Sequence, residues 1–125
     1  DYGLILMRSL ALQSVRKPIP LKTIASENNL PYNYLAQIVI PLKKAGLVES
    51  FEGVKGGYRL KKRPLQISFK EIVDALEGDV HGNRCLLGDE GVCSKKDGCS
   101  VSSWWDHFNE RFQKMIKKMT LADLI

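Results

Sequence analysis

The 125-residue sequence predicts a mainly α-helical protein with one small β-hairpin. Apolar residues recur at three- and four-residue steps through most of the chain, which is typical of helices that pack on a core. Two short alternating segments flank a glycine-rich turn near residue 55, which predicts a hairpin. A run of aromatic residues and methionines near the C-terminus repeats at helical spacing, which predicts a long final helix.

The composition is that of an ordinary folded domain, with 44% hydrophobic and 26% charged residues. A net charge of +5 suits an anionic partner, with nucleic acid the first expectation and a membrane surface the second. No run of 18 apolar residues occurs, so no membrane span is expected, and the first residues do not resemble a signal peptide. Three cysteines, an odd number, favour metal ligands or redox sensors in a reducing compartment, so we expect a cytoplasmic protein of a prokaryote-like cell.

The first predicted helix covers residues 2–15. Asp1 stands at its start, where the helix dipole and the free N–H groups favour a carboxylate. The side chains expected on its buried face are Leu4, Met7, Ala11 and Leu12. Two prolines, Pro18 and Pro20, predict a stiff connector after it.

A pair of short helices follows, over residues 21–29 and 32–45. Leu30 and Pro31 form the predicted turn between them, and Gly46 stops the second helix. Pro41 lies inside that helix, where it removes one backbone hydrogen bond.

Residues 47–51 and 58–60 alternate as two strands around the glycine-rich turn at residues 53–57. Ser68 and Glu71 form a capping box that opens a helix through Glu77. The final helix is expected from about Val101 to Met119, and Thr120 looks like the cap of a short last turn.

Two short helices with a tight turn, followed by a glycine-tipped hairpin, predict a winged helix-turn-helix. The second helix of such a pair enters the major groove of DNA, where Asn and Gln bond adenine in bidentate fashion. The predicted contacts to DNA are Tyr32, Asn33, Tyr34, Gln37 and Lys43 in the helix, and Lys55 and Arg59 in the wing. Ser26 and Lys44 are further candidates for phosphate contacts. The alternative for the polar residues is an ordinary solvated helix surface.

The apolar face of the last helix either packs on its own domain or pairs with a second copy. We favour a homodimer, which would place two second helices on a palindromic operator. The expected division is therefore a DNA-binding domain at residues 1–77, a cysteine-rich loop at 78–100 and a dimerisation helix at 101–125.

Cys85, Cys93 and Cys99 lie in a segment with glycines and few apolar residues, which needs something besides a core to order it. Thiolates suit an iron–sulfur cluster, zinc or copper(I), and the wide spacing favours a cluster over a zinc ribbon. Three cysteines leave the site one ligand short, and the candidates are Asp1, His81, His107 or an exogenous group.

Three alternatives accompany the cluster. The thiols could act as a redox switch without metal, or could bind zinc. A redox enzyme or electron carrier is a third reading, but the sequence shows no nucleotide-binding glycine motif and no nucleophile–base pair, so we expect no enzyme.

Several stretches occur together in a characteristic order: Asp1 to Leu4, Leu35 to Ile38, Ala45 to Val48, Gly56 to Leu60 and Thr120 to Leu124. With the three cysteines, they resemble the IscR/NsrR family of bacterial winged-helix transcription regulators along nearly the whole chain. The resemblance implies a homodimeric regulator, expected here to be a repressor, whose two-iron or four-iron cluster controls DNA affinity in response to redox state, nitric oxide or iron–sulfur status.

The resemblance also bears on the fourth ligand. Nitric-oxide-sensing members use an Asp in the same Asp-Tyr context from the opposite subunit, which implies Asp1. Members that regulate cluster biogenesis use a His three residues after the third cysteine, where this chain has Ser102, so that assignment does not carry over. The chain also has Ala36 where those members have Glu, and seven residues between its first two cysteines where the family usually has five.

Overall fold

The computed structural model describes residues 1–13, 17–78 and 96–125. The helices are α1 (Tyr2–Leu12), α2 (Leu21–Glu27), α3 (Tyr32–Lys44), α4 (Phe69–Glu77) and α5 (Ser102–Lys118), and the strands are β1 (Val48–Phe51) and β2 (Gly57–Leu60). Short 3-10 turns are η1 (Pro64–Gln66), η3 (Lys96–Gly98) and η4 (Leu121–Leu124). The predicted mainly helical fold with one antiparallel hairpin is confirmed.

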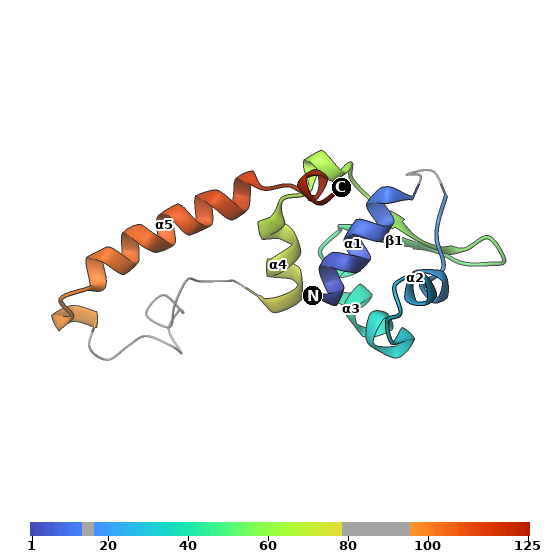
Figure 1. Ribbon diagram of the computed structural model, residues 1–125, viewed down its shortest axis with the longest axis horizontal. Helices are drawn as coiled ribbons and strands as arrows, with labels where there is room; N and C mark the ends of the chain where they lie inside the picture. Colours follow the sequence, from blue (N-terminus) through green and yellow to red (C-terminus); the bar gives the residue numbers. More distant parts are fainter. Residues whose placement is uncertain (14–16, 79–95) are drawn as a thin grey trace.

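Helices α1 to α4 and the hairpin pack into one body, and α5 extends away from it (Figure 1). The core of this body draws on every one of these elements and on η4. Its fully buried members are Leu6, Met7, Ile24, Leu35, Leu42, Leu47, Val48, Ile67, Ile72 and Leu121. No helix of the described residues is both long enough and apolar enough to cross a membrane.

The buried face of α1 agrees in part with the predicted one. Met7 is buried, and Leu4 and Ala11 are partly buried against the core, whereas Leu12 is half exposed. Leu6 and Leu10, which the prediction did not place on this face, are also buried, because apolar residues lie all around this helix. The face that carries Gly3 is packed against α4, where the Leu76 side chain occupies the place that a Cβ on Gly3 would take. The predicted last residues of this helix, 14 and 15, lie outside the described part of the chain.

The turn between α2 and α3 begins earlier than predicted, because α2 ends at Glu27. Asn29 has a φ of 53°, a left-handed conformation that Asn adopts more readily than most residues. The Leu30 N–H donates to the Ala25 carbonyl at 2.8 Å and closes the turn. The Asn28 amide donates to the Ser9 hydroxyl at 3.1 Å, which ties the turn to the inner face of α1.

The hairpin is joined to the connector that precedes α2. Strands β1 and β2 pair in antiparallel register from Val48 opposite Leu60 to Phe51 opposite Gly57. Ile19 and Tyr58 exchange backbone hydrogen bonds of 2.9 and 2.8 Å, so the connector extends the hairpin at the β2 edge. Gly57 has a φ of 147°, and a Cβ there would lie 2.3 Å from the Ile19 carbonyl carbon. Only glycine allows this approach of the two backbones.

The predicted capping box at the start of α4 is confirmed. The Ser68 hydroxyl accepts from the Glu71 N–H at 3.1 Å, and the Ser68 N–H donates to the Glu71 carboxylate at 2.8 Å. Burial raises the pKa of Glu71, but hydrogen bonds from Ser68 and Lys62 outweigh it and leave this pKa below its ordinary value. The cap also receives the chain returning from α5, since the Phe69 N–H donates to the Met119 carbonyl at 2.7 Å.

We expect Gly57→Ala to lower the free energy of unfolding by about 2 kcal/mol or more, because the new Cβ overlaps the Ile19 backbone in a conformation that L-residues avoid. Urea denaturation measures this change. Gly53→Ala is the matched control, since Gly53 also has a positive φ, of 100°, but open space around it. It should cost only the backbone strain, about 1 kcal/mol. Equal losses in the two variants would contradict a special role for the Gly57 contact.

Candidate nucleic-acid interface

Helix α3 presents a ridge of exposed side chains spaced three and four residues apart: Asn33, Gln37, Ile40 and Lys44. The opposite face is buried through Leu35, Val39 and Leu42. No hydrogen bond or ion pair within the described residues engages Asn33, Gln37 or Lys44. These polar groups are therefore available to an external partner. The sequence interpretation missed Ile40, which is 46% exposed, although its spacing from Asn33 and Gln37 was the signal that could have found it.

Two tyrosines flank this ridge, and each contacts a neighbouring helix. The Lys22 ammonium of α2 lies 5.9 Å from the centre of the Tyr32 ring. The Tyr34 ring meets the Tyr2 ring of α1 edge to face, with centroids 5.3 Å apart. Both rings remain about half exposed, Tyr32 at 44% and Tyr34 at 54%. The sequence interpretation did not include Lys22, because its distance from Tyr32 depends on how α2 and α3 pack.

The two predicted cations of the wing differ in their surroundings. Lys55 is exposed beside Val54 at the end of the hairpin and has no ion-pair partner in the described part of the chain. Arg59 donates from Nε to the Glu49 carboxylate at 2.6 Å, and its guanidinium lies 4.5 Å from the centre of the Phe51 ring. The cross-strand register brings these groups together, since Arg59 lies directly opposite Glu49. Lys55 is therefore available at the wing, whereas Arg59 is already engaged.

The remaining predicted phosphate contacts are exposed. Ser26 lies on the outer side of α2, and Lys43 and Lys44 end α3. Lys43 and Lys44 line a shallow recess with Val39, Ile40 and Tyr58, which places them beside the base of the hairpin. Cations thus follow α3 toward the wing.

Of the predicted metal ligands, Cys85 and Cys93 lie outside the described residues, as does His81. Cys99 is half buried just before α5, and its carbonyl accepts hydrogen bonds from the Ser102 N–H at 3.3 Å and hydroxyl at 3.1 Å. Across residues 1–13, 17–78 and 96–125, no three His, Cys, Asp or Glu side chains gather closely enough to hold a metal ion.

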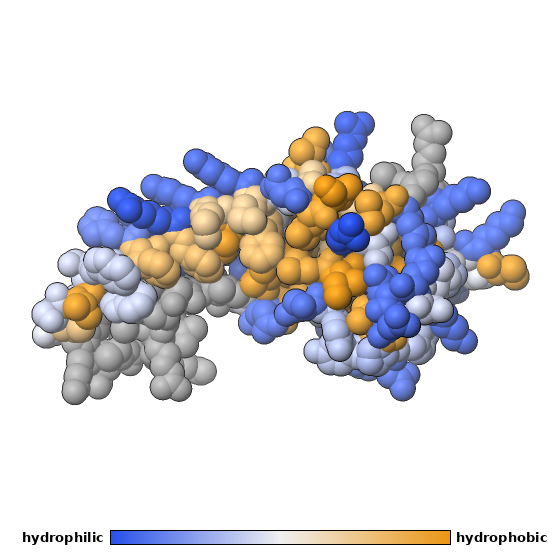
Figure 2. All heavy atoms as spheres, in the orientation of Figure 1, coloured by the Kyte–Doolittle hydropathy of each residue, from blue (hydrophilic) through white to orange (hydrophobic). Residues whose placement is uncertain are grey.

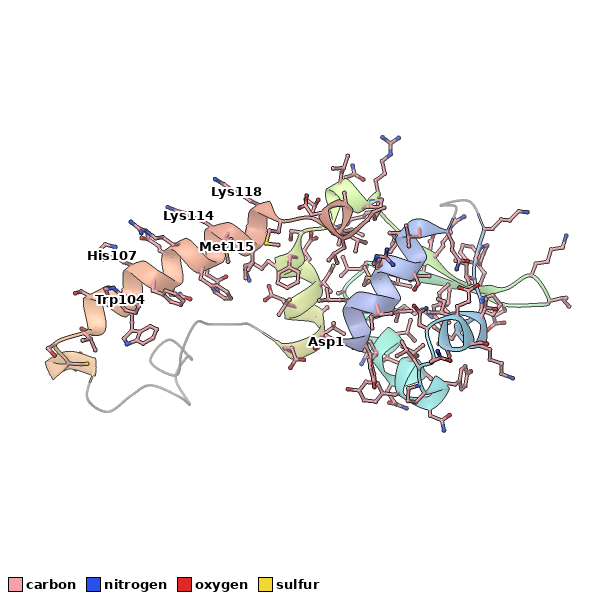
Figure 3. All side chains as sticks on the ribbon, in the orientation of Figure 1. Asp1, Trp104, His107, Lys114, Met115 and Lys118 are labelled. Atoms are coloured by element: carbon pink, nitrogen blue, oxygen red, sulfur yellow. The ribbon has the colours of Figure 1, made fainter. Side chains whose placement is uncertain are left out.

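Asp1 lies on the main body, far from the segment that carries Cys99. Its side chain does not cap α1, and it lines a recess of about 120 Å³ with Leu76 and Glu77, at the end of α4. Figure 3 shows Asp1 against the main body, while the chain that carries Cys99 lies beyond the far end of α5. One copy of the chain therefore does not bring Asp1 and Cys99 together.

Helix α5 leaves most of its apolar face exposed. Ile116 is its only buried residue, whereas Trp104, Phe108, Met115 and Met119 are 57%, 38%, 52% and 43% exposed. The rings of Trp104, Phe108 and Phe112 stack in a row along the helix, with successive centroids 5.5 and 6.2 Å apart. Figure 2 shows this apolar band continuing from α5 onto the main body. The domain does not cover the band.

The sequence is similar to those of known proteins. The family model of Rrf2, described as an iron-dependent transcriptional regulator, matches residues 1–125. The chain is 34% identical to the HTH-type transcriptional regulator IscR of Serratia proteamaculans over 124 residues, which cover 99% of this chain and 74% of that protein.

Two solved structures are also similar. CymR, the global cysteine regulator of B. subtilis, is 35% identical with a TM-score of 0.78, and the match covers 98% of this chain and 89% of that one. IscR of T. potens is 32% identical with a TM-score of 0.74, and the match covers 98% and 80% of the two chains.

We expect Glu49→Ala to strengthen binding to duplex DNA of any sequence, because it releases Arg59 for a phosphate contact. The slope of log binding constant against log salt should steepen by about 0.9 for each subunit bound, the value for one added phosphate contact. Glu52→Ala is the matched control, since it removes the same charge from the same hairpin without freeing a cation. A similar change of slope in both variants would contradict the release of Arg59.

Proposed function

This chain belongs to the Rrf2 family of transcriptional regulators, and from this premise we propose that it is a homodimeric repressor that binds a palindromic operator and senses redox, nitric oxide or iron–sulfur status through its cysteine segment. Helix α3 would read bases in the major groove, and the hairpin would contact the neighbouring minor groove. A regulator of this kind acts where the DNA is, which in a bacterium is the cytoplasm. It is not an enzyme, in keeping with its family.

One observation carries the DNA-binding part of the proposal. The α3 ridge and the wing are built on one shared core, and Asn33, Gln37 and Lys55 are exposed on it without side-chain partners in the described residues. Asn33 and Gln37 lie four residues apart on one face, so both amides can meet base edges in the same groove. Lys55 would meet phosphate. The predicted contacts at Tyr32, Tyr34 and Lys43 would lie at the edges of this surface.

The exposed face of α5 supports the homodimer. Residues 101–125 would supply the dimer helix, although their last turn packs on the main body through Leu121. A contiguous band of aromatic and methionine side chains is costly to leave in water. Pairing of two copies about a two-fold axis would cover this band on both helices.

The same dimer supports a sensor site shared between subunits. We propose that Cys85, Cys93 and Cys99 of one copy and Asp1 of the other hold an iron–sulfur cluster. Asp1 suits this role because its carboxylate is exposed and caps no helix, and because it lies too far from Cys99 of its own chain to serve there. The cluster, when bound, supplies a centre that nitric oxide, oxidants or loss of iron would destroy.

The chain offers a direct route from Asp1 to the recognition helix. Asp1 is followed by Tyr2, and the Tyr2 ring packs against Tyr34 of α3. Any shift of the first turn of α1 would therefore move or release Tyr34. Such a shift changes DNA affinity only if the cluster bound to Asp1 stabilises one position of α1 more than the other.

A second sensing chemistry is favoured by the structural match to CymR, a global cysteine regulator. In this alternative the three thiols respond without a metal, by disulfide or sulfenic acid formation. Cys99 is half buried beside α5, so its oxidation would bear on the same dimer helix. Zinc bound by the thiols is a third chemistry, and metal analysis separates it from the other two.

Selection of bound sequences from a random duplex library tests the regulatory proposal. The purified dimer should enrich a site with two inverted halves whose centres lie about one helical turn, or a multiple of it, apart. Recovery of no preferred sequence, with binding equal to that of random DNA, would overturn sequence-specific regulation.

We expect Met115→Glu to weaken the dimer at least about tenfold, because it places a charge in the apolar band and removes about 1.5 kcal/mol of burial. Sedimentation equilibrium measures the dissociation constant. Ser103→Glu is the control, since it adds the same charge to α5 away from the exposed band. A Met115→Glu protein that dimerises as tightly as the control would place the interface elsewhere.

We expect Asp1→Ala to shorten the lifetime of a cluster in anaerobically isolated protein severalfold, without lowering the dimer content. Iron, sulfide and zinc analysis of the wild type comes first, and protein without iron or sulfide would rule out the cluster and leave zinc or thiol chemistry. His107→Ala is the matched control, because His107 is the other described candidate ligand. A shorter lifetime in that variant alone would move the fourth ligand to His107.

A further inference from the structure

A recess separates the connector before α2 from the end of the wing. Its volume is about 470 Å³, and it is lined by Lys17, Pro18 and Pro20 on the connector and by Val54, Lys55 and Gly56 on the hairpin. None of these residues except Lys55 belongs to the predicted DNA surface. The connector and the hairpin run beside each other in Figure 1, on the side of the body away from α5.

Backbone hydrogen bonds hold both walls of the recess. The connector is held to β2 by the paired hydrogen bonds between Ile19 and Tyr58, and the two prolines fix the backbone on either side of Ile19. The hairpin turn is closed by the Gly56 N–H, which donates to the Gly53 carbonyl at 3.0 Å. The distance between the Lys17 and Lys55 ammonium groups therefore varies mainly through the conformations of these two side chains.

The recess is lined by cationic and apolar side chains, which suits a ligand that carries both negative charges and apolar surface. Lys17 and Lys55 are both exposed, and neither has an ion-pair partner among the described residues. The carboxylate of Glu52 lies in the same hairpin but does not line the recess. Pro18, Pro20 and a fully exposed Val54 supply apolar surface in the same lining. A sugar–phosphate strand alternates these two characters, with charged phosphates and apolar deoxyribose faces.

We infer that the recess clamps one sugar–phosphate strand of the bound duplex, with Lys17 and Lys55 on its phosphates and Val54 against its sugars. This inference rests on the proposed DNA-binding function and extends the interface to the connector. It makes Lys17 a phosphate-binding residue and the wing one half of a two-sided grip. Since the grip reads no base edges, it adds affinity equally for all sequences.

The test uses the full dimer and a mixed-sequence 30-base-pair duplex, with binding followed by fluorescence anisotropy over a range of KCl concentrations. Because the dimer carries two copies of each lysine, Lys17→Ala should reduce the slope of log binding constant against log salt by about 1.8, and the Lys17→Ala/Lys55→Ala double variant by about 3.6. Lys17→Arg should keep the wild-type slope, because it keeps the charge. Lys114→Ala is the matched control, since Lys114 projects from α5 far from the wing (Figure 3).

The outcomes separate the clamp from the function on which it rests. A wild type that binds no duplex overturns the proposed function and the clamp together. A wild type that binds, with an unchanged slope for Lys17→Ala, overturns the clamp alone and returns the connector to a structural role. A loss of slope for Lys114→Ala as large as that for Lys17→Ala also overturns the clamp, because any surface lysine would then have the same effect.

Discussion

The backbone contact between Ile19 and the start of β2 determines the position of the wing relative to the helix pair. Two hydrogen bonds join Ile19 to Tyr58, and the absence of a side chain at Gly57 lets the connector approach. Because α2 begins two residues after Ile19, the same contact sets the position of the wing relative to α2 and hence to α3. The Asn28–Ser9 hydrogen bond sets the position of the turn between α2 and α3 relative to α1. The ridge and the hairpin therefore act as one surface.

Within that surface, a cation that already has a partner is less available to a phosphate than a cation without one. The Glu49–Arg59 pair is about one-third exposed and is worth at most about 1 kcal/mol, and the contact of Arg59 with Phe51 adds a similar amount. Arg59 loses both when it moves to a phosphate, whereas Lys55 loses neither. Sequence position alone, which places both residues in the wing, does not distinguish them.

Two features of α1 and α5 are incomplete in a single copy of the chain. Helix α5 carries an apolar band that its own domain does not cover, and Asp1 lies on the main body, far from the segment that carries Cys99. The proposed two-fold dimer would account for both features, because it would bury the band and would bring Asp1 of one copy toward the cysteines of the other. In that arrangement, Tyr2 and Tyr34 would connect the shared site to the DNA surface.

Local signals in the sequence were sufficient for the elements themselves. The Ser68–Glu71 capping box, the stop at Gly46 and the glycine-tipped hairpin act over a few residues, so they could be predicted without knowing the fold. The exposed Asn33 and Gln37 followed from helical spacing. The family of the chain also followed from short stretches in a characteristic order, as the Rrf2 match confirms.

Tertiary packing decided the rest, because it depends on residues distant in the chain. Leu12 is exposed although it was predicted to be buried, because the elements packed on α1 cover Leu6, Met7 and Leu10 and leave Leu12 in solvent. Arg59 is held by a neighbour across the hairpin, and Lys17 and Lys55 line one recess only because Ile19 pairs with Tyr58. The separation of Asp1 from Cys99 likewise depends on the path of α5 away from the body. The sequence determined which residues carry the chemistry, and the fold determined which of them can act together.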